Sequence, residues 1–118
     1  MTEERETGKT TVAPDVLIAI AKMAALGVPG VSRMANVSGG VNRLLKRGIH
    51  DGVRIDVEDN IVTARLYLVL KQDVNIREVS RDVQAQVARA IREMIGMDVD
   101  RIDIHIEDID YEEEATTA

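Results

Sequence analysis

The segment Gly52–Lys71, GVRIDVEDNIVTARLYLVLK, decides the fold because apolar and polar side chains alternate in it over two runs. Every second residue is apolar in Val53–Val57, and again in Val62–Leu70. Such alternation predicts two strands, each with one buried and one solvent-exposed face. Asp59-Asn60 between the runs predicts a tight hairpin turn, since both residue types tolerate left-handed backbone angles. The residues expected on the wet side of the second strand are Thr63, Arg65, Tyr67 and Lys71.

The clearest helix follows the hairpin. Asn75 can cap its first turn, Glu78 three residues later completes a capping box, and Gly96 ends the helix. Its apolar residues recur at steps of three and four. They are Ile76, Val79, Val83, Val87, Ala90, Ile91 and Met94. A last strand then places its isoleucines inward at 102, 104 and 106, with Arg101, Asp103, His105 and Glu107 outward.

A second helix precedes the hairpin, over Asp15–Leu26, with Pro14 in its first turn and Gly27 as its stop. Its predicted apolar stripe consists of Val16, Leu17, Ile20, Met23, Ala24 and Gly27. Thr10–Val12 could form a short strand before it. Between this helix and the hairpin, Val28-Pro29-Gly30 is typical of a turn, and Val41–Arg47 resembles one or two turns of amphipathic helix.

These elements predict an α+β fold, a two-layer sandwich with two main helices packed on one face of a three- or four-stranded, mainly antiparallel sheet. We expect a disordered lead-in over 1–9, a single domain over 10–110 and an acidic, disordered tail over 111–118. A chain of 118 residues leaves little room for a second domain.

Composition excludes several classes of function. The chain has no Cys, which removes disulfides, thiol nucleophiles and cysteine-bound zinc. It has no Trp or Phe to stack on bases, and its net charge of -6 argues against binding nucleic acid or anionic lipid directly. The polar start resembles no signal peptide, and no apolar run is long enough to span a bilayer. We therefore expect a soluble protein that does not insert into the membrane by itself.

The sequence predicts no catalytic, cofactor or metal site. His50 and His105 lack a partner at metal-binding spacing, and the carboxylates of the strands alternate with apolar residues as a solvated sheet face requires. Ser38-Gly39-Gly40 lacks the Lys-Ser/Thr ending of a phosphate loop.

One basic patch is the candidate site, and it lies within residues 32–52. Its residues are Arg33, Arg43, Lys46 and Arg47. Such a patch can meet an acidic partner, the acidic tail of a neighbouring copy or anionic headgroups, and it can also be a merely solvated loop.

An ordered set of short motifs resembles the alkaline-shock protein family. The motifs are Thr11–Ala21 followed by Val28-Pro29-Gly30-Val31, then Gly52-Val53-Arg54-Ile55, then Asn75–Val79 with Val83, Gln84 and Val87, and finally Gly96–Val99 leading to Ile102–Ile106. Together they cover the chain from about Thr10 to Ile109. Lys71-Gln72-Asp73 departs from the family pattern, in which many members carry an aromatic–glycine pair there.

The resemblance implies a bacterial cytoplasmic protein without known catalysis, linked to alkaline and cell-envelope stress. Some members of the family self-associate and are held at the membrane by a small integral membrane partner. The sequence thus predicts a non-enzymatic envelope-stress protein that acts through protein–protein contacts. The alternative is an RNA- or ribosome-associated accessory module, and a third hypothesis, an enzyme, would require a pocket lined by convergent polar groups.

Overall fold

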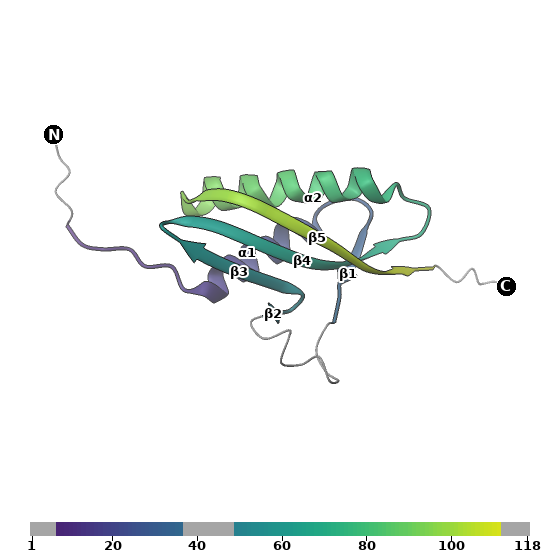
Figure 1. The fold of residues 1–118 in the computed structure, drawn as a ribbon, viewed down its shortest axis with the longest axis horizontal. Coiled ribbons are helices and arrows are strands. Elements are labelled where there is room, and N and C mark those ends of the chain that lie inside the picture. Colours follow the sequence, from purple (N-terminus) through teal and green to yellow (C-terminus); the bar gives the residue numbers. More distant parts are fainter. Residues whose placement is uncertain (1–6, 37–48, 112–118) are drawn as a thin grey trace.

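The computed structural model describes residues 7–36 and 49–111, which form a helical layer on one face of a sheet (Figure 1). Helix α2 continues into a short π-helical turn, η2, before the last strand. In chain order the elements are α1 (Pro14–Leu26), β1 (Val31–Met34), β2 (Ile49–His50), β3 (Val53–Glu58), β4 (Ile61–Lys71), α2 (Ile76–Ala90), η2 (Ile91–Ile95) and β5 (Asp98–Asp110).

Strand β4 is the centre of the sheet because it pairs with three other strands. β3 pairs antiparallel with its first half and β1 antiparallel with its end. β5 runs parallel to β4 along the whole length from Ile61 to Lys71, so β1 and β3 share the other side of β4. The two-residue strand β2 adds to the free side of β3. The predicted α+β sandwich is confirmed, and its sheet has five strands because two short ones, β1 and β2, join the three that alternation predicted.

The core lies between the helices and the inward face of β4. The alternate residues from Val62 to Leu70 that were predicted to face inward are at most 1% exposed. Val83 and Val87 of α2 and Ile91 of η2 are fully buried in the same cluster. Helix α1 adds a further set of buried side chains, Leu17, Ile18, Ile20, Ala21 and Ala25.

Two turns have the backbone that their sequences require. Asp59 and Asn60 both have positive φ (54° and 65°), as predicted for the hairpin between β3 and β4. Between α1 and β1, the N–H of Val31 donates to the carbonyl of Val28 at 3.2 Å. Pro29 stands second and Gly30 third in this four-residue turn, and Gly30 has φ 103°, a conformation that L side chains rarely adopt.

The ends of α2 and η2 follow the predicted signals. The side chain of Asn75 accepts a hydrogen bond from the N–H of Glu78 at 2.9 Å, which caps the first turn of α2. Gly96, with φ 81°, ends the helical segment in the left-handed conformation. The π-helical form of the last turn was not predicted.

Some interpretations of the sequence were wrong. Thr10–Val12 is not a strand, and Val12 instead packs partly against the core near α1. Val16 and Met23 face outward, with 44% and 58% of their surface exposed. Helix α1 carries only two charged residues, so its sequence did not distinguish the buried face from the outer one. Ile76 and Met94, predicted to lie on the apolar stripe of the long helix, are also exposed.

The helix expected at Val41–Arg47 lies outside the described residues. The bounds proposed for the lead-in, the single domain and the tail stay predictions.

Candidate interaction surfaces

Of the predicted basic patch, the structure describes only Arg33, because Arg43, Lys46 and Arg47 fall outside the described ranges. The Arg33 guanidinium donates through Nε to Asp110 Oδ2 at 3.0 Å and through Nη2 to Oδ1 at 3.2 Å. Ser32 Oγ donates to the same carboxylate at 2.7 Å. These contacts connect β1 with the end of β5, so the charge of Arg33 already has a partner within the chain.

The pKa values of this pair shift in the directions that its contacts require. The hydrogen bond from Arg33, followed by the one from Ser32, lowers the pKa of Asp110 below its ordinary value of 3.8. The same hydrogen bond and the attraction of Asp110 raise the pKa of Arg33. Both side chains are partly in water, so the pair acts as a surface clasp between strand ends.

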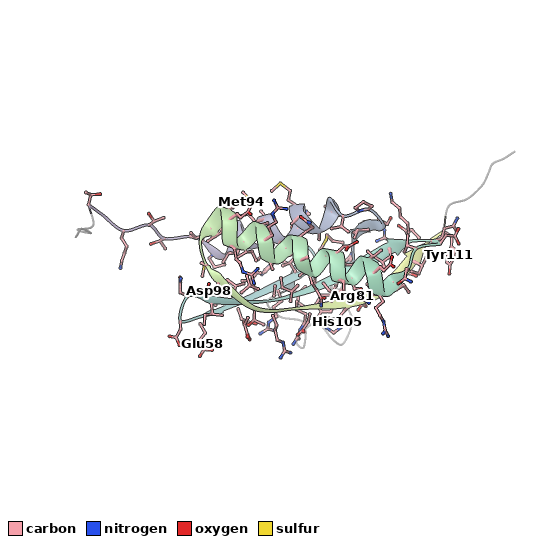
Figure 2. All side chains as sticks on the ribbon, turned by 90° about the horizontal axis from the view of Figure 1, so that it is seen from above. Glu58, Arg81, Met94, Asp98, His105 and Tyr111 are labelled. Atoms are coloured by element: carbon pink, nitrogen blue, oxygen red, sulfur yellow. The ribbon has the colours of Figure 1, made fainter. Side chains whose placement is uncertain are left out.

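The face of the sheet away from the helices carries charges and one aromatic stack. Figure 2 shows Glu58 and His105 on this open face, opposite α2. The rings of Tyr67 and His105 stack with centroids 4.8 Å apart and planes 14° apart. Tyr67 is only 8% exposed, although the alternation of β4 predicted a wet position.

A small second apolar cluster explains the burial of Tyr67. Its buried members are Ala35, Tyr67 and Val69, with Ile49 packed against them. Ala35 follows β1 and Ile49 lies in β2, so both reach β4 through tertiary structure. Local alternation in β4 carries no information about these neighbours, which is why the cluster was not predicted.

The outer edge of β5 is the longest unpaired strand edge in the described part of the chain. β5 has 13 residues and pairs with β4 on one side, and no described strand pairs with its other side. A groove of about 780 Å³ runs between this edge and the first half of α2, with Ile104 and Ile106 on the strand side and Arg77 and Arg81 on the helix side. An edge of this kind can pair with a further strand.

The outer surface of the helical layer is apolar in places. Val16, Met23 and Leu26 of α1 are 40–58% exposed, and Met94 of η2 is 61% exposed. A groove of about 440 Å³ between α1 and α2 is lined by Met23, Ala24 and Ala85 among others. These exposed apolar residues are the candidates for a contact surface on the helical layer.

Within ranges 7–36 and 49–111, no group of three or more His, Cys, Asp or Glu side chains is placed to hold a metal ion. Asp103 raises the pKa of Arg101 through a hydrogen bond and then through charge attraction, as in an ordinary surface ion pair.

Among the described helices, none is both long and apolar enough to cross a membrane.

These features define a class of protein, a small α+β sandwich whose described candidate sites are strand edges and faces suited to contacts with other macromolecules. The chain belongs to the alkaline-shock protein family, described as having a cell envelope-related function, whose family model matches residues 2–111. This match confirms the resemblance that the sequence motifs indicated.

Curated relatives cover almost the same length. The chain is 32% identical over 115 residues to the uncharacterized protein YqhY of Bacillus subtilis, a match that spans 96% of this chain and 85% of YqhY. It is 30% identical over 103 residues to the uncharacterized protein Spy1535 of Streptococcus pyogenes, spanning 86% of this chain and 79% of that protein.

The fold also resembles solved structures of the MamM CTD. The copper form matches with a TM-score of 0.56 at 18% identity, over 89% of this chain and 92% of that chain. A variant in its zinc form matches with a TM-score of 0.54 at 18% identity, over 84% and 86% of the two chains. At this identity the likeness shows a shared fold alone.

Proposed function

We propose that this chain is a non-enzymatic protein of the bacterial cell-envelope stress response, acting by association with itself and with other proteins. The observation that carries the proposal is the family match over residues 2–111, to a family described as having a cell envelope-related function.

The surfaces on the described part of the chain support a role in protein contacts. The free edge of β5 presents backbone groups that a further strand can pair with. The exposed apolar residues of α1 offer a face on which an amphipathic helix of another protein can pack.

We further propose that an integral membrane partner holds the protein at the membrane. The net charge of -6 opposes direct adsorption to an anionic leaflet, so a protein contact is the more favourable route. The outer face of α1, where Met23 is 58% exposed, is the surface we assign to this contact.

Imaging and affinity purification from native cells test the proposal together. The tagged chain is imaged at its native expression level, with and without envelope stress, and is purified from detergent-solubilised cells with and without nuclease. We expect a peripheral distribution and a nuclease-resistant membrane protein in the eluate. A uniform distribution in stressed and unstressed cells would overturn recruitment, and ribosomal proteins that disappear with nuclease would favour the RNA-associated alternative.

A matched pair of variants locates the contact. Met23→Lys places a charge on the apolar face of α1 and should abolish recovery of the membrane partner. Thr63→Lys adds the same charge to the open face of the sheet and should leave recovery unchanged. Equal recovery with both variants would show that the outer face of α1 is not the contact.

A further inference from the structure

The outer edge of β5 has the charge pattern of a strand that pairs with a copy of itself. We propose that two copies of this chain associate through antiparallel pairing of their β5 strands, centred on Ile104. The inference names the surface for the self-association proposed above and rests on it.

Alternate residues of β5 direct their backbone N–H and C=O groups toward the free edge of the strand, as such pairing requires. The Gln84 side-chain amide donates to the carbonyl of Ile102 at 3.0 Å, so this carbonyl points toward α2 and the free edge. Both backbone groups of a residue in a parallel strand point to the same side, and the side alternates along the strand. Ile102, Ile104 and Ile106 therefore direct their N–H and C=O groups outward, and of these groups the Ile102 carbonyl already accepts from Gln84.

Irregularities in the pairing with β4 limit the regular part of this edge. The register with β4 shifts between Val99 and Arg101, and again between Ile106 and Asp108. The stretch Arg101–Ile106 between the two shifts is regular, and such irregularities bend a strand away from further pairing. A partner strand thus has about six residues to pair with, and the middle of that stretch lies between Asp103 and Ile104.

Several registers bring inward residues opposite inward residues. The charges of the outward side chains favour one of these registers. Pairing that preserves the faces must bring inward residues opposite inward residues, so the twofold axis passes through residue 103, 104 or 105. An axis at Asp103 places two aspartates opposite each other, and like charges destabilise strand pairs. An axis at His105 places two histidines opposite each other and leaves Asp103 without a basic residue opposite it in the regular stretch.

The axis at Ile104 brings complementary side chains together on the open face. Asp103 lies opposite His105 of the second copy, whose imidazole can donate a hydrogen bond. By symmetry this contact occurs twice. Asp103 also pairs with Arg101 of its own chain at 3.0 Å, and 33% of its side chain stays exposed for the contact with the second copy.

The inward face fits the same register. Ile102 then lies opposite Ile106 of the second copy, and the two Ile104 side chains meet at the axis. Ile104 and Ile106 are only half-buried in the single chain, and both line the groove beside α2. Their remaining exposed surface would be covered by the same residues of the second copy, so one register satisfies both faces.

Disulfide trapping distinguishes the three registers, because the natural chain has no cysteine. Asp103→Cys and His105→Cys are made as separate, differently sized tagged chains and oxidised mildly, each alone and mixed. We expect a cross-linked heterodimer in the mixture, since these positions face each other in a closely spaced pair when the axis is at Ile104. Predominant cross-linking of Asp103→Cys alone or of His105→Cys alone would overturn the register.

Charge reversal tests the same pairing without a new covalent bond. Asp103→Lys or His105→Glu alone should raise the dissociation constant of the dimer roughly tenfold, because each change repeats at two symmetric contacts. The double variant should restore wild-type affinity, and a double variant as weak as either single one would overturn the pairing. Glu58→Arg, on β3 with β4 between it and β5, should leave the affinity unchanged.

Sedimentation of the unmodified chain separates failure of this inference from failure of the proposed function. Dimers without the mixed cross-link would show that the copies meet through another surface, which overturns β5 pairing and leaves self-association standing. A chain that stays monomeric over the whole accessible concentration range would overturn both.

Discussion

Replacing Gly30 with alanine should destabilise the fold by an amount that can be separated into two parts. Gly30 has φ 103°, where an L side chain is strained by about 1–2 kcal/mol. A Cβ at this position would lie 2.8 Å from Cγ2 of Val79, a buried side chain of α2. Overpacking of this kind costs about 1–3 kcal/mol, so we expect Gly30→Ala to lower the free energy of unfolding by about 2–5 kcal/mol.

Two other glycines provide the controls. Gly96 has φ 81° but open space around its Cβ position, so Gly96→Ala should cost only the backbone strain of about 1–2 kcal/mol. Gly8 has neither a positive φ nor any atom within 4 Å of an added Cβ, and Gly8→Ala should change stability by less than about 0.5 kcal/mol. The difference between the Gly30 and Gly96 variants measures the clash.

The assay is urea unfolding followed by far-ultraviolet circular dichroism, since the chain has no Trp to report by fluorescence. Val79→Ala removes the methyl group that an alanine at position 30 would meet. The double variant should therefore be more stable than the sum of the two single losses predicts. Additive losses, or equal losses for the Gly30 and Gly96 variants, would refute the assignment of the clash.

Three further variants test the helix cap, the orientation of α1 and the clasp between strand ends. Asn75→Ala removes the acceptor for the Glu78 N–H and should lower the free energy of unfolding by about 0.5–2 kcal/mol, measured by urea unfolding. Asn75→Asp retains an acceptor oxygen and should keep most of the wild-type stability. Met23→Ser should change stability by less than about 0.5 kcal/mol because the side chain faces water, and a loss above about 2 kcal/mol would place it in the core. The lowered pKa of Asp110 means that its charged form stabilises the fold above the unfolded pKa near 3.8, and that this contribution is lost as pH falls through the lower folded pKa. The stability difference between wild type and Asp110→Asn should therefore shrink as pH is lowered from neutral to acid, and a difference that grows would contradict the clasp.

Local patterns were enough to predict the elements whose two faces differ strongly. Strand β4 alternates over the whole of Val62–Leu70, and every residue predicted inward is buried. The turn at Asp59-Asn60 and the cap at Asn75 are also local, because each depends on side chains within three residues of the backbone that they serve. For these elements the local preference and the tertiary structure agree.

The remaining features depend on contacts between residues far apart in the sequence. The burial of Tyr67 requires Ala35 and Ile49, which reach β4 only after the chain folds. Helix α1 has apolar residues on nearly all sides, so the tertiary structure alone decides that Met23 faces outward. The clasp of Arg33 joins residues 77 positions apart, and no local spacing indicates such a contact.

The parallel pairing of β5 with β4 has a consequence for the order in which the molecule folds. A ribosome releases the chain from its first residue onward, so β5 emerges after every strand with which it shares the sheet. During that interval one side of β4 has no strand partner, although its side chains are among the most apolar of the chain. We expect the nascent protein to be most prone to aggregation in this interval, and chains shortened before residue 98 to remain in that state.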